Sequence, residues 1–147
     1  MAECHPVGYQ WVTEAKARGA KIIHVDPRFT RTSAVADKHI TIRVGTDIAL
    51  LGGVIRHVIE NDLYFKDYVL PYTNASFIIS DDYEGPEDLD GLFSGFDEEL
   101  QGYNNDTWQY VHDPEEPDGI AKDPTLQHPH SVFQILKRHY SRYTPET

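Results

Sequence analysis

The sequence contains a single cysteine, Cys4, and too few apolar residues for an ordinary self-contained domain. One cysteine excludes an internal disulfide and a metal site built from cysteine alone. No run of about 18 apolar residues occurs, so we expect no insertion into a membrane. Residues 1–11 lack the pattern of a signal peptide. Apolar residues make up 39% of the chain, against about 45–50% in average domains, which indicates a hydrated domain or a part of something larger.

Basic residues are missing from residues 81–118, which hold fourteen Asp and Glu. The first 60 residues carry eight Lys/Arg and six Asp/Glu, whereas the remainder carries five and 18, and the net charge is -11. An acidic half of this kind would repel a nucleic-acid backbone, so we expect no nucleic-acid partner. The basic residues of the first 60 could still bind one small anionic ligand.

Hydrophobic periodicity in residues 1–80 predicts an α/β segment. Residues 5–20 suit a helix that ends near Gly19, and residues 21–25 and 39–44 suit short strands. A polar loop with one helical turn at 33–36 separates the strands. The inner face expected for the first helix comprises Val7, Trp11, Val12 and Ala15. A helix followed by glycine and a strand is typical of a βαβ-type unit.

A strongly apolar helix is predicted next, capped by Thr46 or Asp47 and ending near Asn61. Its interior contains the pair Gly52-Gly53, and glycine in a helix interior costs about 1 kcal/mol relative to alanine. We interpret this pair as a sign of close packing.

The second half has less regular patterning. Residues 64–80 suggest a short helix, a break near Pro71 and a strand at 77–79, and residues 129–140 suggest a final amphipathic helix. Its expected inner face comprises Val132, Ile135, Leu136 and His139. Residues 81–128 are turn-rich but contain too many aromatics for a disordered segment. We therefore predict three parts: the α/β segment 1–80, an acidic insertion 81–128 held by aromatic anchors, and a C-terminal helix at 129–147.

The first candidate site lies where the run KIIHV ends at Asp26. In open α/β sheets, ligands bind beyond the carboxyl ends of the strands. An acidic residue there commonly accepts hydrogen bonds from ribose hydroxyls. Arg28 and Arg31 could bind phosphate, with Thr30, Thr32 and Ser33 as hydroxyl donors. The alternative is a solvated turn that Asp26 caps. The absence of a G-x-G-x-x-G turn argues against an ordinary NAD or FAD domain.

The second candidate site is the stretch RVGTD. Gly45 permits close backbone approach, and Thr46 and Asp47 stand at a predicted helix start. A carboxylate there would match the N–H donors on the edge of guanine, although a plain helix cap is the better explanation of this stretch taken alone. Together, the two loops suit the ribose, phosphate and base of one nucleotide.

Other motifs give weaker predictions. His128, His130 and the pair Cys4-His5 fit no zinc signature, so we interpret these histidines as structural or surface residues. No nucleophile motif, catalytic carboxylate pair or EF-hand loop is present. The sequence therefore predicts no catalytic residue and no metal ligand.

The stretches MAECHPVG, VDPRFTRTSAVAD and IRVGTDIALLGGVI, in this order, resemble the large catalytic subunit of molybdenum or tungsten bis-pterin formate dehydrogenases of the respiratory type. The likeness continues through YTNASFI, DGLFSGFD and DPTLQHPHSVFQILKRHYSRYTPE, so it covers essentially the whole chain. It implies a partial Rossmann-like, doubly wound domain of the molybdopterin oxidoreductase fold, with a long irregular acidic insertion.

The resemblance also implies the cofactor, molybdopterin guanine dinucleotide, and the residues that bind it. Glu3 and His5 match a loop along the dinucleotide, and two further loops match at 26–30 and 45–47. The implied cofactor-binding residues are Glu3, His5, Asp26, Pro27, Arg28, Phe29, Thr30, Gly45, Thr46 and Asp47.

In the family the resemblance names, the selenocysteine or cysteine metal ligand, the 4Fe-4S cysteines and a twin-arginine export signal precede this region, and a second pterin-binding half follows it. We therefore expect a fragment, inactive alone, whose partners are the rest of the large subunit, a membrane cytochrome and an iron-sulfur subunit. Formate would be the substrate and the periplasm the location, with the cytoplasm as alternative. One hypothesis explains why the chain starts at Met1: the reading frame restarted there after a selenocysteine codon was read as a stop. Another bis-pterin oxidoreductase, such as a nitrate or thiosulfate reductase, and a non-catalytic binding module remain alternatives.

Overall fold

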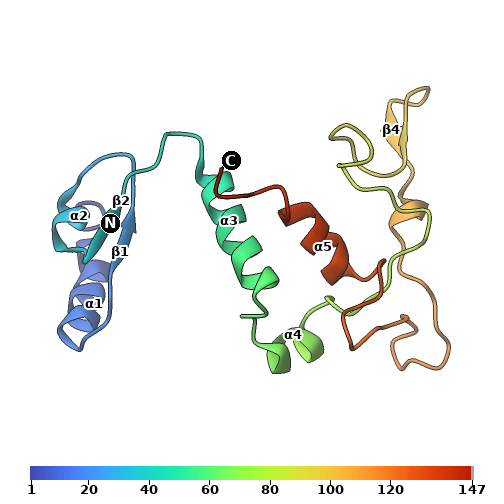
Figure 1. The fold of residues 1–147 in the computed structure, drawn as a ribbon, viewed down its shortest axis with the longest axis horizontal. Coiled ribbons are helices and arrows are strands. Elements are labelled where there is room, and N and C mark those ends of the chain that lie inside the picture. The colour runs from blue at the N-terminus through green and yellow to red at the C-terminus, as the bar shows by residue number, and fades with distance from the viewer. Residues whose placement is uncertain (147) are drawn as a thin grey trace. The chain divides into compact units, whose positions relative to one another are not determined.

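The computed structural model describes residues 1–146. The chain divides into two compact units, Met1–Leu50 and Leu51–Thr147 (Figure 1). Helices and short strands alternate in the first unit, and three helices with long connections build the second. The predicted mixture of helices and strands is therefore confirmed. The division of the chain at residues 80 and 128 stays a prediction.

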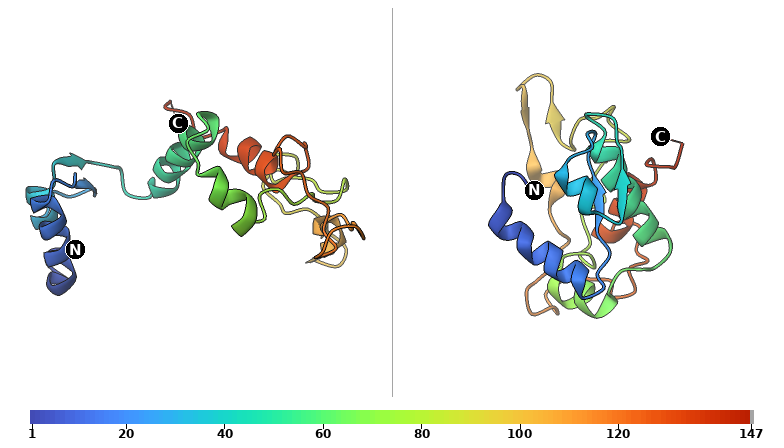
Figure 2. Two further views of the ribbon diagram at one scale, coloured as in Figure 1. Left: turned by 90° about the horizontal axis from the view of Figure 1, so that it is seen from below. Right: turned by 90° about the vertical axis from the view of Figure 1, so that its left-hand side faces the viewer.

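The first unit is built on a pair of parallel strands. Helix α1 (Pro6–Ala17) leads through a turn to β1 (Ile23–Val25), and α2 (Arg31–Val35) leads to β2 (Lys38–Ile40). The register pairs Ile23 with Lys38, His24 with His39 and Val25 with Ile40. Parallel strands require a crossover connection, and α2 lies in it. Two further views show α1 beside these strands (Figure 2).

The side of α1 that faces the strands differs from the prediction. Val7 and Trp11 are 74% and 66% exposed, and the buried residue is Tyr9. The reason is visible about two helical turns after Tyr9. There Lys16 donates a hydrogen bond to the backbone oxygen of Val35 and lies 3.4 Å from an oxygen of Asp37. Positions 9 and 16 share one side of the helix, so this side faces α2 and β2. Val7 and Trp11 of the predicted stripe point away from them, whereas Val12 is half-buried.

The strand predicted at 39–44 is shorter than expected. Its pairing stops at Ile40, because the partner strand β1 itself has three residues. Val44, expected on the alternating face, is 80% exposed.

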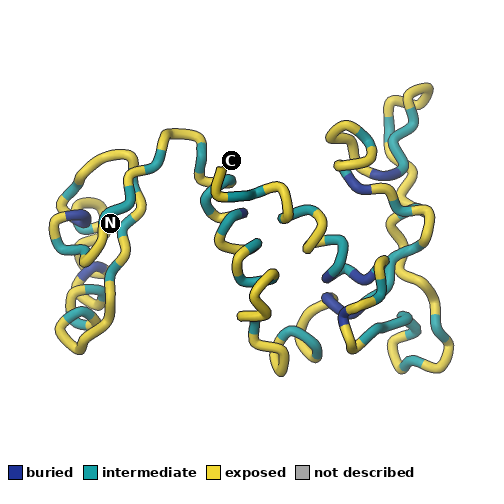
Figure 3. Tube along the Cα trace, viewed as in Figure 1, coloured by how far each residue is buried: buried dark blue, intermediate teal, exposed yellow. Residues whose placement is uncertain are grey.

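The second unit gathers three helices around a small core. Helix α3 (Asp47–Glu60) is followed by α4 (Lys66–Tyr72), whose last turn includes Pro71, and by α5 (Val132–Tyr140) after the acidic region. Ala75, Leu126 and Phe133 form the buried core, which Figure 3 shows in dark blue where α5 meets its neighbouring loops. Four partly buried residues pack on it: Ile59, Tyr64, Val69 and Leu70.

Helix α5 starts later than the periodicity predicted, and its most buried residue was not among the four predicted for the inner face. Ser131 is fully buried and caps the helix by accepting the Gln134 N–H at 3.3 Å. The buried apolar residue is Phe133, while Leu136 is 41% exposed. The ring of Phe133 lies 5.0 Å from that of Tyr64, which fixes the buried side.

The strand predicted at 77–79 is an extended segment with three different partners. Phe77 pairs with Lys122, Ile78 with Ser131 and Ile79 with Tyr110 through isolated bridges. This short segment therefore pairs with residues that lie 31 to 53 positions later in the sequence.

The acidic region contains a small hairpin, β3 (Phe96–Asp97) with β4 (Gly102–Tyr103), and a 3-10 turn, η1 (Asn105–Trp108). Aromatic rings surround Tyr103 at centroid distances of 6.3, 5.2 and 6.4 Å from Phe93, Phe96 and Trp108. Phe77 and Tyr110 meet edge to face at 5.2 Å. These contacts account for order in a segment that is otherwise polar.

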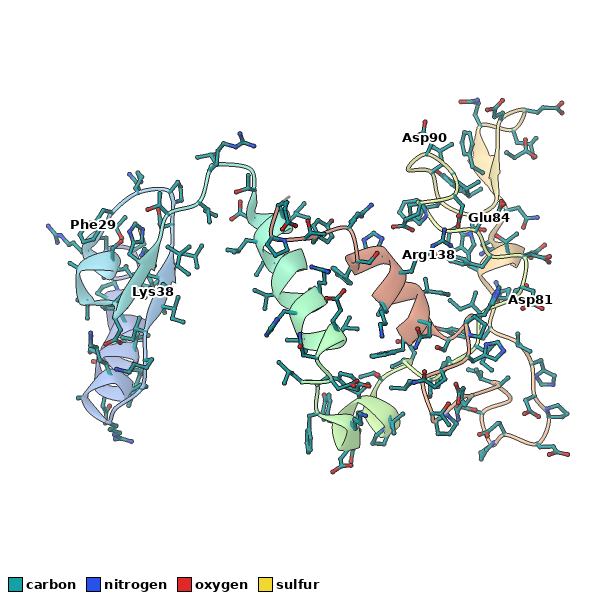
Figure 4. The ribbon with its side chains drawn as sticks, viewed as in Figure 1. Phe29, Lys38, Asp81, Glu84, Asp90 and Arg138 are labelled. Carbon is teal, nitrogen blue, oxygen red and sulfur yellow. The ribbon has the colours of Figure 1, made fainter. Side chains whose placement is uncertain are left out.

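Charged contacts connect α5 to the start of the acidic region. The Arg138 guanidinium donates two hydrogen bonds to the Asp88 carboxylate, one of them at 2.9 Å, and this contact lowers the pKa of Asp88. Glu87 lies 2.8 Å from the His139 ring and 3.5 Å from the Arg142 guanidinium. Figure 4 shows Arg138 extending from α5 toward this region.

Arg138→Gln is therefore expected to loosen residues 85–91 without unfolding the unit. The Leu89 and Gly91 amides, which donate to the backbone oxygens of Gly85 and Pro86, should exchange hydrogen severalfold faster. High salt should produce the same change in the unaltered chain, because exposed ion pairs are screened. Lys137→Gln removes the same charge one position earlier and is the control. Equal exchange in both variants would contradict the role given to Arg138.

Candidate nucleotide-binding loops

Asp26 lies where β1 ends, and both strands fix its position. Its backbone N–H donates to the Ile40 oxygen at 3.2 Å. The carboxylate oxygen Oδ1 accepts the Arg28 N–H at 2.7 Å, and Oδ2 lies 3.8 Å from His24 Nε2. The capping role weighed from the sequence is thus present. A carboxylate has about four acceptor positions, so this contact leaves room for ribose hydroxyls.

The hydroxyls that follow Asp26 hold the protein backbone instead of facing outward. Ser33 accepts the Thr30 N–H at 2.8 Å, and Thr32 accepts N–H groups of Met1 and Ala2 at 3.2 and 3.0 Å. Thr32 and Ser33 are 6% and 4% exposed. The structure therefore argues against the prediction that both donate to phosphate, because these buried side chains do not face a ligand at the surface.

The first two predicted loops are close together. Besides the contacts to Thr32, the Arg31 guanidinium lies 3.6 Å from the Glu3 carboxylate. Glu3 and His5 are exposed, and His5 lines a surface depression that also includes Cys4 and Val7. The segment of the first predicted loop thus contacts the start of α2, which directly follows the second predicted loop.

The third loop has local contacts. Gly45 adopts φ +86°, a conformation that favours glycine, and a Cβ there would meet nothing within 4 Å. The Thr46 hydroxyl donates to the Arg43 oxygen at 2.6 Å, and the Thr46 oxygen accepts the Leu50 N–H. Asp47 is the exposed first residue of α3. These contacts leave the Gly45 backbone and the Asp47 carboxylate open to a ligand.

The side chains at the tip of the second loop are also open. Pro27 and Arg28 are exposed, and Phe29 is 71% exposed. Figure 4 shows Phe29 in the loop before α2. Carboxylates, guanidiniums, an aromatic ring and a helix start are the groups that bind ribose, diphosphate and base. The residues present therefore fit a guanine dinucleotide.

Sequence reasoning missed two histidines beneath this loop. The rings of His24 and His39 stack at a centroid distance of 5.6 Å and an interplanar angle of 24°. Their contact follows from the register of β1 with β2. Two histidines in successive predicted strands, each in a short run before a polar loop, were the available signal.

The histidines near the start of α5 have local roles. The His130 N–H donates to His128 Nδ1 at 3.2 Å, and the His130 ring lies 3.6 Å from an oxygen of Asp81. Within residues 1–146, no three His, Cys, Asp or Glu side chains are grouped so that they could hold a metal ion. In the same range no helix combines the length and apolar character needed to cross a membrane.

Comparison with known proteins places the chain among oxidoreductase subunits. No protein-family model matches it. It is 48% identical over 143 residues to the alpha subunit of formate dehydrogenase 2 (cytochrome c-553) from Nitratidesulfovibrio vulgaris and 52% identical over 147 residues to the formate dehydrogenase-O major subunit of Escherichia coli. These matches cover 97% and 99% of this chain but 14% of each relative. A sulfite dehydrogenase subunit of Allochromatium vinosum is 32% identical over 92% of the chain.

The resemblance stated from the motifs is confirmed by these matches. About half of the residues are shared with formate dehydrogenase large subunits along nearly the whole chain, including the acidic region. The chain accordingly belongs to the family of formate dehydrogenase large subunits, of whose length it spans 14%.

Proposed function

We propose that this chain binds the guanine dinucleotide part of a molybdopterin cofactor within a formate dehydrogenase large subunit. The observation that carries the proposal is the position of Asp26 at the carboxyl end of β1, in the loop that leads into α2, whose Arg31 contacts Glu3. This is the edge at which α/β sheets bind nucleotides. The two parallel strands joined through α2 would then form part of a larger, doubly wound sheet.

Each loop has a proposed task. Asp26 accepts hydrogen bonds from the ribose hydroxyls, and Arg28 with Thr30 positions the diphosphate. Asp47 accepts the N–H donors of guanine, and Gly45 lets the backbone approach the base. Glu3 and His5 lie along the dinucleotide, while Pro27 and Phe29 shape the second loop. All ten residues bind or orient the cofactor, and none of them performs the chemistry.

The intact enzyme would oxidise formate to CO₂. When bound, the cofactor would supply a metal, molybdenum or tungsten, as the acceptor of two electrons, and the oxidation of formate to CO₂ would also release one proton. Those electrons would leave through a 4Fe-4S cluster ligated outside this chain, then through an iron-sulfur subunit, and finally through a membrane cytochrome, with the large subunit in the periplasm. Exposed apolar residues such as Val7, Trp11 and Ile23 suit a surface covered by the remainder of such a subunit.

The proposal can be tested in a full-length relative, the E. coli formate dehydrogenase-O major subunit. There the residues at the positions of Asp26 and Asp47 are both replaced by alanine. The double variant is expected to retain less than half of the pterin and metal per mole of subunit, because ribose and guanine each lose a charged acceptor. Alanine at the position of the exposed Asp67 on α4 is the control. Unchanged pterin content in the double variant would contradict the assignment.

A second candidate is a different bis-pterin oxidoreductase, favoured by the 32% match to a sulfite dehydrogenase subunit. A full-length protein containing this segment should reduce an artificial acceptor with formate if the first proposal is correct. Turnover with sulfite or nitrate, and none with formate, would favour the second. Metal and pterin analysis of the same protein separates both from a non-catalytic binding module.

A further inference from the structure

Two strands and one helix bring a compact polar network together beneath the second loop. His24 Nδ1 lies 2.9 Å from Ser33 Oγ, and the same oxygen accepts the Thr30 N–H at 2.8 Å. His39 Nε2 lies 3.0 Å from the Asp26 backbone oxygen. Because a carbonyl oxygen can only accept, His39 donates here. Both ends of the loop, Asp26 and Thr30, are therefore attached to a histidine directly or through one hydroxyl.

The same histidines place an ionisable group under the loop. The His24 side chain is 15% exposed, and its Nε2 lies 3.8 Å from Asp26 Oδ2. Its ring stacks on His39, whose ring meets Phe29 edge to face at 5.4 Å. Imidazole is the side chain that changes its charge between pH 5 and 8. A proton on this pair adds positive charge beside a loop that carries Arg28 and Arg31.

The charged groups around the pair are few and can be named. Asp26 faces His24 from the loop after β1, and the stacked ring of His39 faces it from β2. Helix α2 contributes the neutral Ser33. On α1, Lys16 is engaged by Asp37. The α-amino group of Met1 lies 3.2 Å from Thr32 Oγ1, next to Ser33.

We propose that His24 and His39 are positioning residues of the Asp26–Thr30 loop. Protonation of these histidines would strengthen the binding of a guanine nucleotide's diphosphate by the loop. This inference rests on the proposed function of the loop. The neutral pair holds the loop in shape through Ser33 and the Asp26 oxygen. The protonated pair keeps these contacts, is attracted to the Asp26 carboxylate and adds a positive charge near the phosphates.

GDP-mannose is a suitable probe, because its diphosphate is a diester and keeps a constant charge between pH 7.5 and 5.5. Binding to the whole 147-residue chain would be followed by NMR through the Arg28 and Thr30 amides, with ligand up to millimolar concentration. We expect the dissociation constant to fall about threefold to tenfold from pH 7.5 to pH 5.5. His57→Gln on α3 removes an exposed histidine of the second unit and should leave this response unchanged.

Two double variants separate hydrogen bonding from charge. His24→Asn with His39→Gln keeps a polar atom near each of the two bonded ring nitrogens but cannot be protonated. It should bind at pH 7.5 within about twofold of the unaltered chain and lose the pH response. His24→Ala with His39→Ala removes both contacts and should bind more weakly at both pH values.

The outcomes distinguish this inference from the function on which it rests. A pH response that survives in the Asn/Gln variant would overturn the role of the histidines and leave the nucleotide site intact. Equal binding by the Ala/Ala variant and the unaltered chain would overturn their positioning role. Absence of saturable shifts in the unaltered chain at both pH values would overturn this inference, whereas the pterin content of the full-length Asp26 and Asp47 variants tests the proposed function separately.

Discussion

Gly52→Ala is expected to destabilise the second unit, whereas Gly53→Ala is expected to be neutral or stabilising. A Cβ at the buried Gly52 would lie 2.6 Å from two ring atoms of Tyr143 and 2.9 Å from a third. At Gly53 the nearest atom would be the Tyr143 backbone oxygen, at an ordinary 3.8 Å. Alanine favours the helix by about 1 kcal/mol at either position, but overpacking costs about 1–3 kcal/mol at the first. Unfolding free energies of the two variants should therefore differ by about 1–3 kcal/mol in urea titrations.

The Tyr143 ring cannot move aside freely. Its backbone N–H donates to the Tyr140 oxygen at 3.1 Å, and its ring lies 5.9 Å from that of Tyr140. The Arg142 guanidinium lies 5.2 Å from the ring centroid. Combining Gly52→Ala with Tyr143→Ala tests the cause, because removing the ring should abolish the cost of the added methyl group. If Gly52→Ala cost as much without the ring as with it, the clash would not be the reason for the glycine.

Local patterns predicted the helices of this chain better than the sides that they bury. The helices at Pro6–Ala17 and Asp47–Glu60 were expected from periodicity, and the close packing expected of Gly52-Gly53 is confirmed at Gly52. The predicted inner face of the first helix was wrong, because an apolar stripe shows that some surface will be covered but not which neighbour covers it. Trp11 and Tyr9 are both aromatic residues of this helix, yet Trp11 is 66% exposed and Tyr9 is buried.

The candidate site likewise has some features that the sequence could predict and others that it could not. The position of Asp26 at the end of a strand could be predicted, since a short β-branched run followed by Asp-Pro is a local signal. The burial of Thr32 and Ser33 could not, because it depends on contacts with Met1 and His24. The stacking of His24 on His39 required the register of two parallel strands, and a shift of that register by one residue would turn one ring to the other face.

Asp123→Ala is expected to lower the unfolding free energy of the second unit by about 2–3 kcal/mol, because hydrogen bonds to a charged group are strong. The carboxylate accepts the Thr125 N–H and hydroxyl at 2.9 and 2.6 Å, and the Gln127 and His128 N–H groups at 2.7 and 2.6 Å. These bonds close the loop that presents Leu126, 3% exposed and at φ +60°, to the core. A leucine in this backbone conformation costs about 1–2 kcal/mol, so the turn needs an external constraint. Asp113→Ala, which removes a carboxylate bonded to the Glu115 N–H at 3.0 Å, is the matched control in urea titrations and should cost less.

The same carboxylate makes the stability of the second unit depend on pH. The Thr125 hydroxyl lowers the pKa of Asp123 most, burial opposes it, and the N–H groups of His128, Thr125 and Gln127 lower it further, to about 2. The folded state thus binds this proton more weakly than the unfolded state, so the contribution is complete above pH 4 and is lost as the pH falls through about 2. Since the group is partly exposed, we expect about 1–2 kcal/mol. Asp123→Asn cannot titrate, so the difference in unfolding free energy between the unaltered chain and this variant should shrink between pH 4 and pH 2. A difference that stays constant over this interval would show that the four hydrogen bonds do not depend on the charge of Asp123.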